Sequence, residues 1–569
     1  MRTHRPSRTT GLLCLTAIAG CAPAPGGVAP ARGAGSGASG GITAADLRSR
    51  LYAYADDSML GREAGKIGDF KATTYIAAEA KRLGLEPAGE NGGYFQVLPL
   101  TRLELDPSTS ISAGGRPLEL WKDYAPLPPI QRIPVALTGR IDVPVIYGGR
   151  LGDTVATITP EQAAGKVVVL GPAIGPAGKP VFGLNPRAFA AFPGAAAIAF
   201  ANFDYAPPGV VDFLRNTPPL MGDGPAPDAG PRPLALFVTS AAAERMLGSS
   251  LEAVQVGATA PALAGTLGFR TGTPEAPARN VVAILRGSDP ALRDEYVAIG
   301  AHNDHIGISR PVPDHDSLWV FNRVMRPQGA ETNPGQPTPE QADRMKTMLD
   351  SLRKIGPSKP DSIRNGADDD GSGTVSVLEI AQAFATARPR PKRSILFVWH
   401  TGEEKGLWGS TWYTDHPTVP RDSIVAQLNI DMVGRGNADD LPGGGPDYLQ
   451  LVGSRRLSTE LGDLVERVNT EGKHGMAFDY QYDADGHPEN IYCRSDHYSY
   501  ARYGIPIVFF TTGVHPDYHM YTDEPQYINY EKMARVDRLI YDVARTVADL
   551  DHRVVVDKPK PDPKGQCKQ

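Results

Sequence analysis

The chain has 569 residues, of which 41% are hydrophobic, and its 58 Lys and Arg against 64 Asp and Glu give a formal net charge of -6. This length and composition exclude a wholly disordered chain and predict about two to four globular domains at roughly 150 residues each. The slightly acidic balance, without a long basic run, argues against nucleic acid as a partner, because a phosphate backbone requires a cationic surface.

Residues 1–20 have the organisation of a secretory signal peptide. Three arginines precede the apolar run 11–19, which has about half of the ~20 residues needed to span a bilayer. The stretch Ile18-Ala19-Gly20-Cys21 resembles the bacterial lipobox, in which the cysteine becomes the acylated first residue of the mature protein. This resemblance implies export and a lipid anchor on Cys21, in the periplasm or at the outer membrane, or secretion. An ordinary cleaved signal with an incidental cysteine is the alternative.

The next segment, 21–42, is almost entirely Ala, Pro, Gly and Ser, so we expect a flexible tether. Of the four cysteines, Cys14 leaves with the signal and Cys21 would be acylated. Cys493 and Cys567 are then the two that an oxidising compartment could pair, and the sequence does not assign a bridge between them.

The remainder has the pattern of an α/β protein. Apolar residues at helical spacing predict helices over 44–55 and 70–83, and Gly84 follows the second where a C-cap glycine is expected. Further along the chain, buried strands alternate with helices, which favours a mostly parallel mixed sheet sandwiched by helices. The predicted strands are Val281–Leu285, Tyr296–Ala301, Ser394–Trp399, Val425–Ile430 and Ile505–Phe510, and the later helices are Thr374–Ala385 and Tyr530–Leu550.

Residues 129–262 differ in composition from the rest of the chain. Predicted strands such as Lys166–Leu170 and Ala196–Ala201 are separated there by loops rich in Pro and Gly. This stretch resembles the protease-associated domain that is inserted into some exopeptidases, and a merely structural α/β insert is the alternative. The predicted organisation is signal peptide 1–20, tether 21–42, N-terminal part of a catalytic domain 43–128, insert 129–262, catalytic domain 263–555 and polar tail 556–569.

Five places in the sequence carry residues suited to metal chemistry. Most of them follow predicted strands, and the carboxyl ends of parallel strands are where open α/β sheets place their sites. Three consecutive carboxylates in a glycine-rich turn, Asp368-Asp369-Asp370, are unfavourable without a cation. The five places are His302-Asn303-Asp304, the turn 366–373, Gly402-Glu403-Glu404, Asp431 and His519.

Imidazole nitrogens and carboxylate oxygens in this ratio suit zinc, with manganese or cobalt as weaker competitors. Two metal ions fit the number of donors better than one, since a pair needs a bridging carboxylate and terminal ligands on each ion.

Together these residues resemble the di-zinc aminopeptidase family that also contains the glutamate carboxypeptidases and the transferrin receptor, over about residues 43–552. The resemblance implies a zinc exopeptidase fold that binds two zinc ions and acts on peptides. It implies that His302, Asp369 and Asp431 hold one zinc, that Asp369, Glu404 and His519 hold the other, and that Asp369 bridges them. Among the twelve histidines, we interpret His305, His400, His497 and His515 as structural, with contact to substrate or metal as the alternative.

The same resemblance implies roles for three further residues. Glu403 would be the general base that takes a proton from the water activated by the two zinc ions, and Asp304 would orient His302. Tyr492 falls where some members place a tyrosine that steadies the tetrahedral intermediate, and a packing role is its alternative. A cis peptide after Asp369 is also implied.

The sequence departs from the compact family pattern over about sixty residues, 307–365, which include a predicted helix Thr338–Leu352. This insertion would either shape the substrate entrance or decorate the periphery.

Three functional classes remain. The leading one is an exopeptidase that removes N-terminal residues from peptides. A carboxypeptidase or other amide hydrolase acting on acidic peptides would need cationic groups, for which Arg494 is one candidate. A binding protein on a peptidase scaffold would be expected to lack ligands, and none is missing in this sequence.

Overall fold

The computed structural model describes residues 41–129, 135–153, 157–176, 178–207, 209–217, 219–222, 232–308, 312–357 and 360–569. The predicted signal peptide, Cys21 and nearly all of the predicted tether lie outside these residues. Within the described ranges, no helix combines the length and the apolar character needed to cross a membrane.

One mixed sheet forms the centre of the predicted catalytic part, and within the described residues it has nine strands. Its central strands β19, β16, β20 and β23 are parallel neighbours, while β15 and β21 pair antiparallel at either side. The predicted α/β class with a mostly parallel mixed sheet is confirmed. In sheet order the strands are β1 (Glu86–Pro87), β15 (Arg279–Leu285), β19 (Ser394–His400), β16 (Tyr296–His302), β20 (Ile424–Ile430), β23 (Ile507–Thr511), β21 (Tyr448–Val452) and β22 (Ala477–Asp479), with β2 (Phe95–Val97) also on β15.

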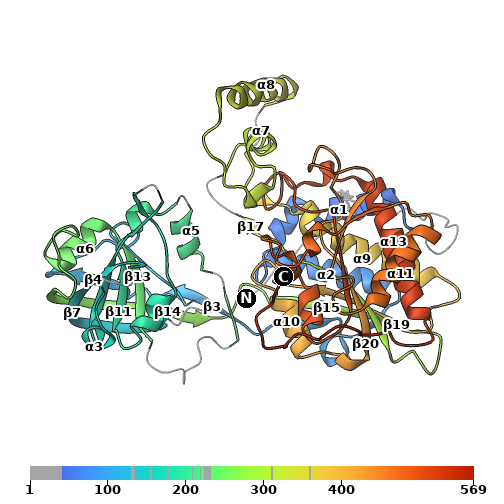
Figure 1. The fold of residues 1–569 in the computed structure, drawn as a ribbon, viewed down its shortest axis with the longest axis horizontal. Helices are drawn as coiled ribbons and strands as arrows, with labels where there is room; N and C mark the ends of the chain where they lie inside the picture. Colours follow the sequence, from blue (N-terminus) through green and yellow to red (C-terminus); the bar gives the residue numbers. More distant parts are fainter. Residues whose placement is uncertain are drawn as a thin grey trace, which may run out of the picture. The chain divides into compact units, whose positions relative to one another are not determined.

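Both faces of this sheet are buried, which is why its strands are continuous apolar runs rather than alternating patterns. Along β15, Val281 and Ala283 face one hydrophobic cluster, whereas Val282 and Ile284 face another. The first cluster receives α1 (Ala44–Tyr54), α2 (Ile67–Arg82), α9 (Gly373–Thr386), α11 (Thr459–Glu471) and α13 (Tyr530–Asp549), and the second receives α10 (Trp408–Asp415) and α12 (His497–Ala501). Figure 1 shows α9, α11 and α13 packed beside one another.

Local capping explains where several helices begin and end. Thr43 caps α1 by accepting a hydrogen bond from the Asp46 backbone nitrogen at 3.1 Å. The α2 helix begins three residues before the predicted start, and Gly84 follows it with a φ of 73°, a conformation that favours glycine. The helix predicted at 530–550 is α13, and Asn529 caps it through the Lys532 backbone nitrogen.

A second sheet, of ten strands among the described residues, contains the segment predicted as an insert. It draws in strands on both sides of 129–262, because β14 pairs along its length with β7 and also with β3 and β4. Such non-local pairing leaves no compositional mark at a boundary. The strands are β3 (Leu100–Leu105), β4 (Ser110–Ala113), β5 (Arg116–Pro117), β6 (Tyr124–Pro126), β7 (Thr138–Arg150), β8 (Val167–Gly171), β11 (Ala197–Phe200), β12 (Leu220–Met221), β13 (Leu234–Val238) and β14 (Thr259–Gly272), with helices α3 (Pro160–Ala163), α4 (Arg187–Ala191), α5 (Val210–Arg215) and α6 (Ser240–Leu247) and the pair β9 (Ala173–Ile174) and β10 (Pro180–Val181).

The insertion 307–365 starts and ends in a short antiparallel pair, β17 (Gly307–Ile308) with β18 (Ile363–Arg364). It contains the predicted helix as α8 (Pro339–Ile355), for which Thr338 and Gln341 form a capping box. It also contains a helix that the sequence analysis did not predict, α7 (His315–Met325), in which Val320 and Met325 are buried.

Candidate active site

The strand order brings the predicted ligands to one edge of the central sheet. His302 is the last residue of β16 and pairs in parallel register with His400, the last residue of β19. Glu404 follows β19 by four residues, and Asp431 directly follows β20. These side chains therefore meet at the carboxyl ends of three adjacent strands, where an open α/β sheet offers a crevice.

Two groups of donors adjoin at Asp369. The Nε2 atom of His302 lies 3.1 Å from Asp369 Oδ1 and 3.7 Å from Asp431 Oδ1. On the other side, Nε2 of His519 lies 3.0 Å from Asp369 Oδ2 and 3.1 Å from Glu404 Oε2. All five predicted metal ligands are thus brought together, and Asp369 is the side chain common to both groups.

The two aspartates that flank Asp369 position the turn. Asp370 accepts hydrogen bonds from the backbone nitrogens of His302, Gly373 and Met432, at 3.1, 2.8 and 3.2 Å. Its carboxylate therefore joins the end of β16 to the start of α9 and to the residue after Asp431. The peptide bond between Asp369 and Asp370 is cis, as the family resemblance predicted.

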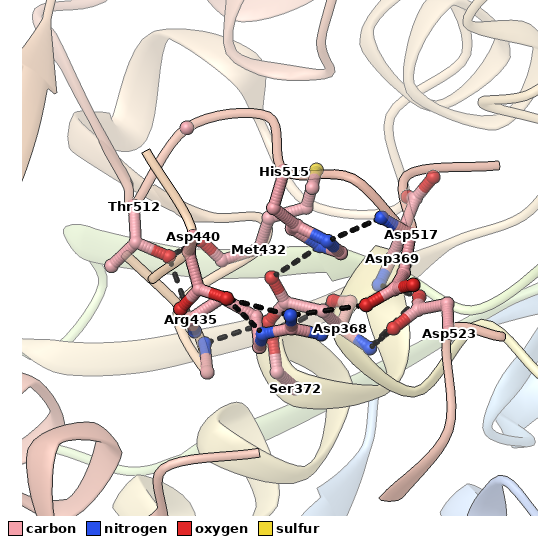
Figure 2. A network of polar contacts seen from close by, with 12 residues as sticks. Asp368, Asp369, Ser372, Met432, Arg435, Asp440, Thr512, His515, Asp517 and Asp523 are labelled. Atoms are coloured by element: carbon pink, nitrogen blue, oxygen red, sulfur yellow. Dashed lines mark hydrogen bonds and ion pairs between the residues drawn. The ribbon is translucent and has the colours of Figure 1, made fainter. Parts of the chain in front are cut away.

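Further buried groups hold the turn from the opposite side (Figure 2). Asp523 accepts hydrogen bonds from the backbone nitrogens of Asp368 and Asp369, each at 3.0 Å. Asp368 in turn accepts from the Gly434 nitrogen at 2.7 Å and faces His515 Nε2 at 3.2 Å. The roles of these residues are defined by contacts between distant segments, so sequence reasoning did not find them. The crowded carboxylates are the local signal that pointed to this turn.

Glu403 lines the same pocket as His302, Asp369 and Asp431. Burial raises the pKa of its carboxyl group well above the usual range; His302 opposes this rise, and the neighbouring carboxylates, Asp431 first, add to it. The Glu403 backbone nitrogen donates to Asp304 Oδ1 at 3.1 Å, and the Asp304 carboxylate lies 3.7 Å from His302 Nδ1. Asp304 therefore contacts both the predicted base and a predicted ligand.

Tyr492 is not among the described residues that line this pocket. It is buried in the second hydrophobic cluster, with its ring 5.7 Å from those of His497 and Tyr498 and the Arg456 guanidinium over its face at 4.3 Å. These contacts fit its alternative packing role. The tyrosines that line the pocket are Tyr482 and Tyr518, and the Tyr518 ring stacks on His519 at 3.9 Å.

Arg494 also lines the pocket, where acidic groups surround it. Its Nη2 lies 2.5 Å from Oε1 of Glu331, which belongs to the insertion, and its Nη1 lies 3.6 Å from Glu489 Oε2. Next to it, Cys493 forms a disulfide with Cys567, a pairing that the sequence left open.

Several buried polar atoms of the site lack a hydrogen-bond partner among the described residues, and this tests whether a metal would fit. They include Asp369 Oδ2 and Glu404 Oε1, together with both ring nitrogens of His305. Buried polar atoms normally have a hydrogen-bond partner or a metal ion beside them. Each unpaired atom therefore indicates a partner that the described residues do not supply. Nitrogen and carboxylate donors that converge in this way fit a divalent cation such as zinc.

An α/β domain with converging histidine and carboxylate donors at the carboxyl edge of its sheet defines a candidate metallohydrolase. Residues 280–544 match the family described as Peptidase family M28. The match covers just under half of the chain and includes all five predicted metal ligands.

Curated relatives match parts of this chain. A protein named leucine aminopeptidase 1, from Sclerotinia sclerotiorum, is 29% identical over 192 residues, which are 32% of this chain and 47% of that protein. Leupeptin-inactivating enzyme 1 of Streptomyces exfoliatus is 32% identical over 150 residues, 26% of this chain and 30% of that protein. The chain thus spans less than half the length of each of these relatives.

Solved structures with a similar course of the chain include an aminopeptidase from Aneurinibacillus sp. strain AM-1. The TM-score is 0.48 at 18% identity, covering 92% of this chain and 98% of that one. A zinc aminopeptidase from Bacillus subtilis gives a TM-score of 0.46 at 18% identity, covering 88% and 94% of the two chains.

Proposed function

We propose that the protein is a metal-dependent exopeptidase that removes N-terminal residues from peptides and uses two zinc ions bridged by Asp369. The observation that carries this proposal is that the two carboxylate oxygens of Asp369 face different histidines, His302 at 3.1 Å and His519 at 3.0 Å. A bridging carboxylate with terminal donors on both sides is what a two-metal hydrolase requires. Manganese and cobalt suit the same donors less well.

Zinc, when bound, would polarise the peptide carbonyl and lower the pKa of water towards ~7. The chain's own part is proton transfer: Glu403, in the same pocket, would accept the proton of the attacking water and return it to the leaving amine. Asp304 would position Glu403 through its backbone nitrogen and His302 through its ring.

The walls of the pocket favour an apolar N-terminal residue. Its lining includes Met432, Ile491, Phe509 and Val514. A glutamate-carboxypeptidase-like amide hydrolase would need an uncompensated cation for the substrate carboxylate, but Arg494 already faces two carboxylates. The name leucine aminopeptidase, borne by the Sclerotinia relative, agrees with the same choice.

The test is a substrate screen of the purified protein, stripped of metal by chelation and reloaded with zinc. We expect cleavage of aminoacyl substrates with a free amine, loss of this activity in the stripped protein and its return with zinc. Cleavage of N-blocked acidic peptides alone would select the carboxypeptidase alternative. Full metal content without any cleavage would favour a binding protein.

We further propose that the chain is exported and anchored through acylated Cys21, with no other membrane contact and no nucleic-acid partner. The disulfide between Cys493 and Cys567 supports export, because disulfides persist in oxidising compartments outside the cytosol. Replacing Cys21 by alanine should release the protein from membranes, and unchanged membrane recovery would refute the anchor. We also propose that residues 129–262 form a protease-associated domain inserted into the catalytic domain.

A further inference from the structure

His305 lies three residues beyond the end of β16, is fully buried and points into the metal site. Its Nδ1 atom is 2.7 Å from Glu404 Oε1 and 3.8 Å from Asp369 Oδ2. These three residues form a converging set of donors that shares only Asp369 with the set of His302, Asp369 and Asp431. The resemblance to the family placed no ligand at this position.

The three donor atoms share a second property: each is buried and has no hydrogen-bond partner among the residues that the structure describes. His305 Nδ1 and Glu404 Oε1 are close, yet they lack the alignment that a hydrogen bond needs. Leaving such atoms unpaired is unfavourable, and one cation placed between them would satisfy all three.

The backbone of the neighbouring turn holds the His305 ring in place. Gly366 has a φ of 52°, and a Cβ atom there would lie 2.3 Å from the Asp369 carbonyl oxygen and 2.5 Å from both Cγ and Cδ2 of His305. The Arg62 guanidinium donates to the Asn365 and Gly366 carbonyls at 2.5 and 2.7 Å, and the Arg62 carbonyl accepts from the His305 backbone nitrogen at 3.1 Å. Glycine at position 366 therefore provides the space that this ring occupies, and Arg62 connects the two segments.

We propose that His305 is a protein ligand of the second metal ion, together with Asp369, Glu404 and His519. The inference rests on the proposed function and deepens it by making the two sites unequal. The second site then has four protein donors, whereas His302, Asp369 and Asp431 provide three to the first. Since four protein donors are typical of closed zinc sites and three of sites with an open position, the second ion is held more firmly and the first exchanges more readily.

The test compares His305→Gln with His497→Gln. His497 is a matched control because it is also fully buried with both ring nitrogens unpaired, but it lies outside the donor groups. Each metal-free protein is titrated with zinc against a competing chelator, and its zinc X-ray absorption spectrum counts imidazole ligands. We expect His305→Gln to weaken one of the two sites by more than the roughly 10- to 100-fold that losing an outer-shell partner costs, and His497→Gln to weaken neither.

Imidazole counting separates a ligand from a neighbour that merely orients Glu404. The wild type should show three imidazoles for two zinc ions and His305→Gln should show two. Two imidazoles in the wild type would overturn the proposal, and this measurement needs no variant to fold. A wild-type protein that binds fewer than two zinc ions would instead contradict the proposed function.

Discussion

Replacing Glu403 by glutamine should separate proton transfer from metal binding. The backbone at this position is held by bonds that do not involve the carboxylate: its nitrogen donates to Asp304 Oδ1 at 3.1 Å, and its carbonyl accepts from Gly406 and Leu407 at 2.8 and 3.0 Å. Glutamine has the same size and keeps all three bonds. The substitution therefore removes the base with little change in structure.

The expected loss follows from the role of the side chain. Positioned general bases contribute about 10²- to 10⁴-fold to the rate, which corresponds to about 3 to 5 kcal/mol of transition-state stabilisation. Stability should not fall in parallel, because glutamine has the same size and keeps the three backbone hydrogen bonds at this position. We expect kcat to drop by that factor while the zinc content and the thermal unfolding midpoint stay near those of the wild type.

The adjacent Glu404 supplies the control, since Glu404→Gln alters a proposed metal ligand and should lower zinc affinity as well as kcat. Steady-state kinetics at saturating substrate and metal analysis of the same samples distinguish the two variants. A Glu403→Gln protein that keeps two zinc ions and loses less than about tenfold in kcat would refute the assignment of the base.

Three further predictions concern specificity and stability. Glu331→Gln removes an acidic partner of Arg494. Because both side chains are about one-third exposed, this ion pair contributes at most about 1 kcal/mol. In a competition assay, kcat/KM for peptides with an acidic N-terminal residue, relative to those with leucine, should therefore rise by up to about fivefold. Burial lowers the pKa of His497 to about 3, so the neutral ring contributes stability that is lost as pH falls below about 6.5. Between pH 7 and pH 4, urea unfolding should show a loss about 3 kcal/mol larger in the wild type than in His497→Gln, and equal losses would contradict this. Cys567→Ser opens a bridge with a sequence separation of 74 and should lower the unfolding free energy by at most about 4 kcal/mol, with no further effect of reductant.

The central sheet could be predicted from sequence because each strand is a short apolar run with both faces buried. Three of the five predicted ligands, His302, Glu404 and Asp431, follow from the same pattern, since polar side chains just after such runs must lie at one edge of a parallel sheet. The strand from Tyr296 ends at His302, and the strand from Ile424 ends one residue before Asp431. Asp369 and His519 lie outside this pattern, and only the family resemblance implied their roles.

His305 could not be assigned in this way. Its ring contacts Glu404 and packs against Gly366. Along the chain, Glu404 lies roughly one hundred positions and Gly366 roughly sixty positions from His305, and only folding brings them together. The single local signal was a second histidine three residues after His302 at a strand end. Tyr492 shows the opposite case, because a sequence match near the site did not reveal that its ring packs under Arg456.

The insertion 307–365 is joined to the site through specific contacts, which bears on whether it shapes the entrance or only decorates the periphery. Arg323 of α7 donates to Asp517 Oδ2 at 2.7 Å, and Arg435 donates to the same oxygen at 3.0 Å; Figure 2 shows the buried surroundings of Asp517. His519, a proposed metal ligand, lies two residues after Asp517 in the sequence.

A second set of contacts from the insertion reaches the neighbouring residue and the pocket wall. The Ala330 nitrogen donates to the Tyr518 carbonyl at 3.0 Å, and Glu331 pairs with Arg494. Gly329 permits this approach, because a Cβ at its position would lie 2.4 Å from the Tyr518 carbonyl oxygen. The insertion thus contacts the loop that carries a proposed ligand on one side and a charged residue of the pocket on the other. A peripheral decoration would need neither contact, and these contacts join the insertion to two segments of the site.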